Sequence, residues 1–305
     1  MKTLSALIKR NVKLFFKDKG LFFTSLITPM ILLVLYATFL GNIYRDSFLS
    51  SIPKELQAVI DIPEKLVDGF VGGQLVSSIL AVSCVTVSFC SNMLSVQDKA
   101  TGTVRDLTIS PVSPSLMALS YYLATLCSSV LICLGATAVC LGYVAAIGWY
   151  LSLADVLLLV LDVIVLVLFG TALSSLINFF LSTQGQISAV GSIVSSCYGF
   201  VCGAYMPISQ FSEGLQTAIS FLPGTYGTAL VRNHALRGVF EEMEALGLPA
   251  DLIKLTRDSV DCNLYFFDNV VPIGVMYLVL ALTIAALIGT FVLLHIARGR
   301  RGARF

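Results

Sequence analysis

The chain has 305 residues, of which 57% are hydrophobic and only 12% are charged, and its mean hydropathy is +0.90. Soluble domains carry about 25% charged residues. The composition therefore excludes an ordinary soluble globular protein and indicates a chain that lies mostly within a lipid bilayer.

The first twenty residues place apolar and basic side chains on opposite sides of a helix. Leu4, Leu7 and Leu14 share one side, while Lys9 and Lys13 share the other. This pattern predicts an amphipathic helix over 1–20 that lies in the membrane interface. A basic flank that only sets the orientation is the alternative.

Six apolar segments follow that are long enough to cross a bilayer, whose hydrocarbon core of about 30 Å needs roughly 20 residues of helix. Helices are expected because lipid offers no partner for unpaired backbone groups. We predict an all-α integral membrane protein with one transmembrane domain over 1–305, and Pro29 should kink its first span. The predicted spans are 21–41, 70–94, 117–147, 153–181, 187–206 and 270–295.

The distribution of Lys and Arg predicts the orientation, because basic residues in short loops stay cytoplasmic. Both ends of the chain are basic, so both termini are expected inside the cell. The loops 95–116 and 182–186 are then cytoplasmic, and 42–69 and 207–269 are outside. The basic residues are Lys2, Lys9, Arg10, Lys13, Lys17 and Lys19 at the start and Arg298, Arg300, Arg301 and Arg304 at the end.

Several common catalytic and cofactor motifs are missing from the sequence. It contains no GxxxxGK[ST] phosphate loop, no HExxH and no GxSxG. The cysteines form no CxxC pair and the two histidines are far apart, so we expect no catalytic residues and no metal site. If the protein uses ATP, a partner must bind it.

Two acids lie within the fourth predicted span. Asp155 and Asp162 are seven residues apart and share a helix face. Because a charge near mid-membrane costs about 2.5–3.5 kcal/mol, each should face protein or water. For the deeper Asp162 the possible roles are a cation contact, a proton relay, half of a catalytic pair, or a carboxyl hydrogen-bonded to a neighbouring helix through Ser, Thr or Tyr.

Spans two and five each carry a stripe of small and polar residues along one helix face. Such stripes permit close helix packing in lipid, and a wetted substrate route would use the same residues. Both explanations hold if the stripes meet at a dimer interface. The candidate route residues are Ser77, Ser78, Ser88 and Asn92 in span two and Ser188, Ser192 and Ser195 in span five.

The outer segment from 206 to 238 is too apolar for a solvated loop. Between Pro207 and Pro223 apolar residues recur at helical spacing, which predicts a short helix at or in the outer leaflet. Two further short helices are expected over 239–246 and 250–260. Cys262 lies in this region, either as a free thiol or paired between chains.

The loop 97–115, with sequence QDKATGTVRDLTISPVSPS, resembles a motif of the membrane subunits of type 2 ABC exporters, in particular the daunorubicin-resistance-like permeases. The resemblance covers nearly the whole chain in segment order, and this chain has Gln97 and Asp98 where many members carry Arg and Glu. The matching loop residues are Asp98, Gly102, Thr103, Pro111, Val112 and Ser113, and the matching outer residues are Pro207, Pro223, Tyr226 and Arg232.

The resemblance implies a permease in the plasma membrane that dimerises with a second copy or a paralogue. Two cytoplasmic ABC ATPase subunits would bind ATP and magnesium, so no cofactor is expected on this chain and no nucleic-acid partner either. The loop would form a coupling helix, and the outer residues would form re-entrant helices. The residues expected to contact the ATPase are Asp98, Lys99, Gly102, Thr103, Arg105, Asp106 and Pro111.

An amphipathic or lipid-like substrate is expected, such as a drug, a peptide or a glycolipid, because the stripes offer hydroxyls and few charges. Two other classes of function stay open. One is a proton-coupled secondary transporter that uses Asp162, and the other is an intramembrane enzyme that acts on lipid or peptide. Neither predicts the loop 97–115.

Overall fold

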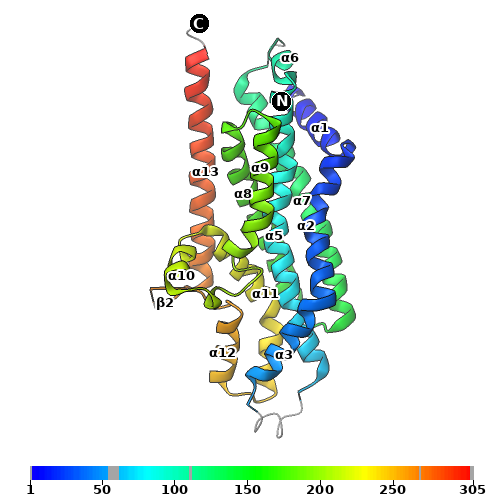
Figure 1. The fold of residues 1–305 in the computed structure, drawn as a ribbon, viewed down its shortest axis with the longest axis vertical. Helices are drawn as coiled ribbons and strands as arrows, with labels where there is room; N and C mark the ends of the chain where they lie inside the picture. The colour runs from blue at the N-terminus through cyan, green and yellow to red at the C-terminus, as the bar shows by residue number, and fades with distance from the viewer. Residues whose placement is uncertain (1, 54–61, 110–111, 268, 303–305) are drawn as a thin grey trace.

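A computed structural model describes residues 2–53, 62–109, 112–267 and 269–302 (Figure 1). These residues are almost entirely helical, and their only strands, β1 (Tyr265–Phe266) and β2 (Asn269–Val270), form one short antiparallel pair. The prediction of an all-α membrane protein is confirmed. The α-helices are α1 (Lys2–Lys17), α2 (Lys19–Leu35), α3 (Gly41–Ser51), α5 (Glu64–Ala100), α6 (Thr103–Ile109), α7 (Pro114–Ile147), α8 (Leu153–Phe180), α9 (Gln184–Val201), α10 (Glu213–Ser220), α11 (Pro223–Ala245), α12 (Ala250–Ser259) and α13 (Ile273–Gly302).

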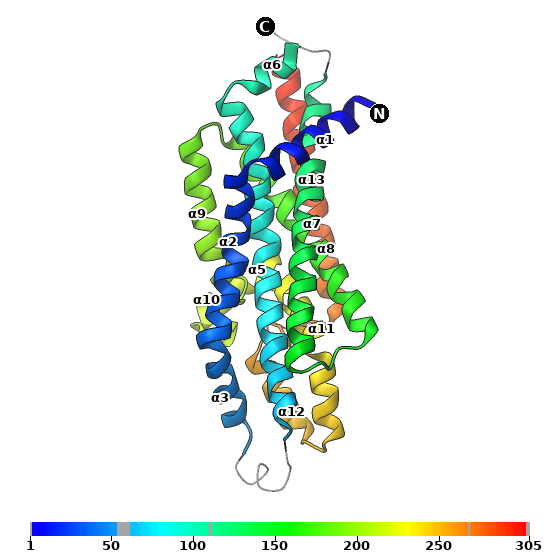
Figure 2. The same ribbon diagram turned by 90° about the vertical axis from the view of Figure 1, so that its right-hand side faces the viewer.

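Helix α5 forms the centre of the bundle and is buried along nearly its whole length. Helices α2, α7, α8, α9 and α11 pack around it (Figures 1 and 2). Small residues make this close packing possible. A Cβ at Gly170 of α8 would lie 3.0 Å from the Cα of Val85 in α5, so the two backbones approach at a distance that a larger residue would prevent.

Four helices of the described residues, α5, α7, α8 and α13, are long and apolar enough to cross a membrane. The pair α1 and α2, bent by 72°, would be a fifth span if it is counted as one. Helix α2 contains Pro29 and is followed by a π-helical turn at Tyr36–Leu40, and the kink at Pro29 stays a prediction. The count of six spans stays a prediction, because α9 is not among these helices and α2 is included only as part of the bent pair.

The N-terminal segment is helical over Lys2–Lys17, and its place in the membrane interface stays a prediction. Lys9 and Lys13 of α1 are exposed, while Asn11 and Phe15 are buried. Asp18 ends this helix, and its carboxylate accepts a hydrogen bond of 3.1 Å from the backbone N–H of Leu21, which caps the start of α2. The bend between α1 and α2 is therefore fixed by local sequence.

Helix α1, helix α6 and the end of α13 lie at one end of the bundle, and α3 and α12 lie at the other (Figures 1 and 2). The basic N-terminal helix thus shares an end with α6, as the predicted orientation requires. Which side of the membrane this end faces stays a prediction.

The outer segment contains a longer helix than the sequence pattern indicated. Short helices were expected over 239–246 and 250–260; the second corresponds to α12, but the first is the end of α11, a helix of 23 residues. Most of α11 is buried against α5, α8 and α13. Its polar side chains Arg232, Asn233 and His234 are each buried with a partner that is distant in sequence.

Candidate functional site

Helix α6 begins after a turn at Gly102. Helix α5 ends at Ala100, and Gly102 has a φ of +82°, in the left-handed region that favours glycine. This turn lets the chain reverse into α6 at Thr103. The predicted loop 95–116 therefore comprises the C-terminal end of α5, the whole of α6 and the first residues of α7. Pro111 lies outside the described residues.

Asp98 lies inside the bundle instead of on its surface. Its side chain joins three helices, because the same Oδ2 accepts from Arg10 Nη1 of α1 at 2.9 Å and from Tyr121 Oη of α7 at 2.5 Å. Burial opposes the charge of Arg10, but the hydrogen bond and charge of Asp98 outweigh it and raise the pKa of Arg10. Since Asp98 is only 7% exposed, it is placed to hold the base of α6 to α1 and α7.

Lys99 connects the same turn to a fourth helix. Its Nζ donates to the carbonyl of Asn178 at 2.8 Å and lies 3.4 Å from that of Leu181, at the C-terminal end of α8. A cation at this position satisfies carbonyls that the helix leaves without partners and interacts favourably with its dipole. We call Arg10, Asp98, Lys99 and Tyr121 the α6 anchor.

The surface of α6 is formed by other residues. Asp106 is exposed, and Ile109 is 85% exposed, which is unusual for a large apolar side chain. Thr103 is half-buried and lies 3.0 Å from Thr101 between the two hydroxyl oxygens. The side chain of Arg105 lies outside the described part of the chain. Ile109 was not among the predicted contacts, although an isolated isoleucine in a polar loop is a visible signal.

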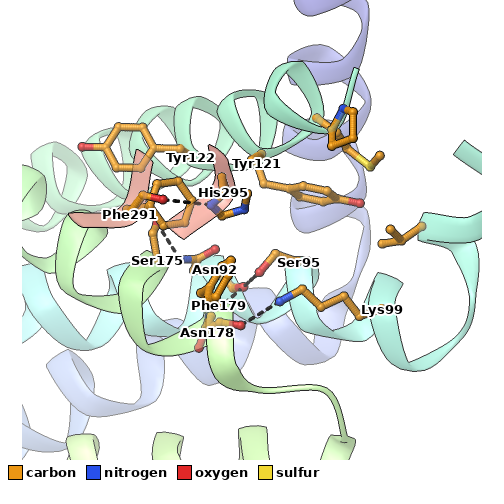
Figure 3. Close-up of a pocket in the computed structure, with 14 residues that line it drawn as sticks. Asn92, Ser95, Lys99, Tyr121, Tyr122, Ser175, Asn178, Phe179, Phe291 and His295 are labelled. Carbon is orange, nitrogen blue, oxygen red and sulfur yellow. Dashed lines mark hydrogen bonds between the residues drawn. The ribbon is translucent and has the colours of Figure 1, made fainter. Parts of the chain in front are cut away.

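A cavity of about 290 Å³ lies beside the α6 anchor (Figure 3). Polar and aromatic side chains both line it, and the residues come from α5, α6, α7, α8 and α13. The polar side chains are Asn92, Ser95, Lys99, Ser175 and Asn178. The aromatic ones are Tyr121, Tyr122, Phe179, Phe291 and His295.

The polar stripe of α5 packs against α8. Asn92 Nδ2 donates to Ser174 Oγ at 3.1 Å and to Ser175 Oγ at 3.0 Å, and Ser88 lies 3.5 Å from the hydroxyl of Thr171. Ser77 donates to a carbonyl of its own helix at 2.8 Å, and Ser78 is buried. These contacts are the close packing that small and polar residues permit in lipid.

The stripe of α9 lies elsewhere. Ser188 and Ser192 are exposed on the single chain, and Ser195 is half-buried. Gly191 faces α5, where an added Cβ would lie 2.5 Å from the methyl carbon of Met93. Since Ser188 and Ser192 are exposed, these two side chains do not pack against the polar stripe of α5 in the described part of the chain.

The outer residues gather around Arg232, which is 1% exposed. Its guanidinium donates to the carbonyls of Val260 at 2.7 Å and Gly203 at 2.9 Å, and it pairs with Asp261 at 3.3 Å. Arg232 therefore fastens α11 to the segments that follow α9 and α12.

The other predicted outer residues begin or fix short elements of the same region. Pro223 is the first residue of α11, and Pro207 precedes the 3-10 turn Ile208–Gln210. Tyr226 Oη donates to the carbonyl of Ser220 at 2.7 Å, which holds the end of α10 against α11. All four predicted outer residues thus lie in one structural region.

A comparison with protein families matches residues 2–235 to the family described as ABC-2 type transporter. The chain belongs to this family. It is thus a membrane permease of the ABC transporter class, as the loop 97–115 predicted. The narrower resemblance to daunorubicin-resistance-like permeases stays a prediction, and a comparison with curated proteins gave no match.

In this ABC-2 permease Asp162 has partners on two other helices. Its Oδ2 lies 2.6 Å from His234 Nδ1 of α11, and its Oδ1 accepts from Tyr277 of α13. A hydrogen bond to tyrosine was one of the alternatives derived from the sequence, while His234 was assigned to a loop and its approach was not foreseen. Seven residues earlier, Asp155 caps α8 through Ser152.

Cys262 is buried, at 2% exposure, and burial raises the pKa of its thiol to about 12. Because the thiolate is the reactive form, we expect Cys262 in the folded ABC-2 permease to resist a membrane-impermeant maleimide at pH 7 and to react after denaturation. Mass spectrometry of the labelled peptide measures this. Rapid labelling of the folded protein, or a dimer linked through Cys262, would contradict it.

Proposed function

We propose that this permease is the membrane subunit of an ATP-driven exporter and that a separate ABC ATPase binds it at α6. The observation that carries the proposal is the combination of an exposed apolar tip, Ile109, with a base fixed by the α6 anchor. An apolar side chain that protrudes from a polar helix fits a groove on a protein partner. ATP and magnesium then reside on that partner.

The α6 anchor gives a path for mechanical coupling. When the ATPase subunits close on ATP, they displace α6 and with it the adjoining end of α5, where Asp98 is bonded to Arg10 of α1 and to Tyr121 of α7. Lys99 extends the connection to the end of α8. A displacement of α6 therefore acts on three helices besides α5, and the bundle opens toward the outside.

The active form is a dimer with a second copy or a paralogue in the plasma membrane, with both termini in the cytoplasm. The exposed Ser188 and Ser192 of α9 support this, because their hydroxyl groups are available on the single chain for contact with a second copy. The substrate is an amphipathic or lipid-like molecule, since hydroxyl groups outnumber charges in both stripes.

Ile109→Asp tests the docking surface. It places a charge at the exposed tip of α6, so we expect co-purification of the ATPase to fall at least about tenfold, equivalent to roughly 1.4 kcal/mol. The measurement is the amount of ATPase retained on the tagged permease, compared at equal permease expression.

Leu255→Asp is the matched control. Leu255 is 65% exposed on α12, at the opposite end of the bundle, so the same type of change there should leave ATPase retention unaltered. Equal retention by Ile109→Asp and wild type would exclude α6 as the docking element. If both variants lost ATPase retention, the cause would be general damage to the permease and not the loss of a docking surface on α6.

A further inference from the structure

Three phenylalanine rings gather in the outer region of the chain. The ring of Phe221, at the end of α10, lies 5.2 Å from that of Phe266 in β1 and 6.4 Å from that of Phe267, and the last two are 4.8 Å apart. Phe221 is 60% exposed and Phe267 is 69% exposed. We call these three residues the aromatic cluster. An exposed apolar patch of this kind indicates contact with a partner or a membrane.

The backbone of the β1–β2 hairpin holds Phe267 at the surface. Phe267 directly follows β1 and has a φ of +45°, a left-handed conformation that favours Gly or Asn and is unfavourable for a bulky residue. Its carbonyl accepts a hydrogen bond of 3.1 Å from the side chain of Asn269, and the backbone N–H of Val271 donates to the carbonyl of Leu264 at 2.8 Å. An exposed aromatic residue in a strained conformation points to a role for its side chain.

The hairpin projects sideways from the bundle, beside the start of α13 (Figure 1). The apolar span of α13 begins at Ile273, three residues after Val270, and has 25 residues. At 1.5 Å per residue this span is about 37 Å long, whereas the hydrocarbon core of a bilayer is about 30 Å thick. The first residues of α13 and the hairpin beside them therefore lie at the level of the lipid head groups.

The surface next to the hairpin is the lipid-facing side of α13. Only 6% of the apolar span of this helix is buried within the described chain, so most of its side chains face lipid. Ile273 and Val275 at its start are exposed, and so is Val270 of β2. The aromatic cluster thus extends an apolar surface that contacts the bilayer.

The same region also contains many polar groups. A cavity of about 560 Å³ lies between α10 and the segment 258–267, and Tyr265 and Phe267 line it together with Glu213, Gln216, Asp258 and Asn263. The carboxylate of Asp258 accepts hydrogen bonds from Asn263 at 2.7 Å and from the hydroxyl of Tyr265 at 3.1 Å, which fastens the base of the hairpin. Hydrocarbon cannot solvate such groups, so the region fits among the head groups and not in the core.

We propose that the aromatic cluster and the β1–β2 hairpin bind the surface of the lipid bilayer, with the rings of Phe221 and Phe267 inserted at the level of the head groups. Aromatic side chains are enriched at this level in membrane proteins. The contact adds the hairpin to the outer-leaflet segment expected between Pro207 and Pro223. Because the hydroxyl of Tyr226 holds the end of α10 against α11, the contact also fixes the depth of α11 in the membrane. It does not depend on the proposed ATPase or on the substrate.

Tryptophan fluorescence of the full-length chain in proteoliposomes tests this contact. The chain has one tryptophan, Trp149, so Trp149→Phe gives a background without tryptophan, to which Phe267→Trp adds a single aromatic probe. The bilayer contains phosphatidylcholine that is brominated at the head-group end of its acyl chains. We expect this lipid to reduce the emission of the Phe267→Trp chain about twofold relative to unbrominated lipid, and aqueous iodide on both sides of the membrane to have little effect.

Leu255→Trp in the same background is the matched control. Leu255 is exposed on α12, which extends beyond α10 at this end of the bundle (Figure 1). Its emission should be quenched by iodide and unaffected by brominated lipid. Phe221→Trp provides a second position in the aromatic cluster and should behave like Phe267→Trp.

Two results would overturn the proposal. If iodide quenches the Phe267→Trp and Phe221→Trp chains as strongly as the Leu255→Trp chain, the aromatic cluster lies in water. If neither iodide nor brominated lipid quenches them, a second copy of the chain or another protein covers the cluster, and its partner is not a lipid surface.

Discussion

Arg232→Leu is expected to destabilise the folded permease by about 3–5 kcal/mol, the usual cost of removing one partner of a buried ion pair. The substitution leaves the carboxylate of Asp261 buried without its counter-ion and removes the donors to the carbonyls of Val260 and Gly203. Leucine also fills less of the space that the guanidinium occupies. The measurement is denaturant or thermal unfolding of the purified chain.

Two further variants separate this mechanism from a general effect of losing a basic residue. Lys254→Leu changes an exposed position on α12 and should shift the free energy of unfolding by no more than about 0.5 kcal/mol. Adding Asp261→Asn to Arg232→Leu removes the orphaned charge and should recover part of the loss. If Arg232→Leu unfolds like Lys254→Leu, the buried ion pair does not stabilise the outer region.

Local patterns were sufficient to predict the fold class. The apolar runs that became α5, α7, α8 and α13 are long enough to be recognised by length and composition alone. Helix α1 follows from the period of its basic residues, and the turn before α6 follows from the freedom of Gly102. Each of these features depends on residues within about one or two turns of helix.

The candidate site was only partly predictable, because its chemistry joins residues that are distant in sequence. Asp98 and Lys99 were identified as candidate contact residues. Nothing in the local sequence shows that Asp98 pairs with Arg10, 88 residues away, or that Lys99 reaches the end of α8. A polar side chain in a loop motif is naturally assigned to the surface. Here Ile109 and Asp106 are exposed on α6, whereas Asp98 and Lys99 bind neighbouring helices at the end of α5.

The same limitation explains α11. A run of Arg, Asn and His argues against burial unless every group has a partner. Those partners are Asp261 for Arg232, the carbonyl of Cys262 for Asn233, and Asp162 for His234. Only the tertiary fold brings these partners together, so the burial of the three side chains could not be predicted from the sequence.

Asp98→Asn is expected to separate ATPase binding from export. The exposed tip of α6 is unchanged, so the ATPase should still co-purify, but the charge that pairs with Arg10 is lost and the hydrogen bond to Tyr121 is weakened. Coupling free energies between sites are typically 1–3 kcal/mol, so export per ATP hydrolysed should fall roughly tenfold. The measurement is substrate export and ATP hydrolysis by the reconstituted complex.

Asp106→Asn is the control, since it makes the same chemical change on the exposed side of α6, eight residues along the chain. If Asp98 acts through the α6 anchor, only Asp98→Asn changes the ratio of export to hydrolysis. If Asp98→Asn instead loses the ATPase altogether, as Ile109→Asp is expected to, the anchor sets the position of the docking surface and not the transmission of its movement. An unchanged ratio together with full ATPase retention would show that the contacts among α1, α5 and α7 contribute only to stability.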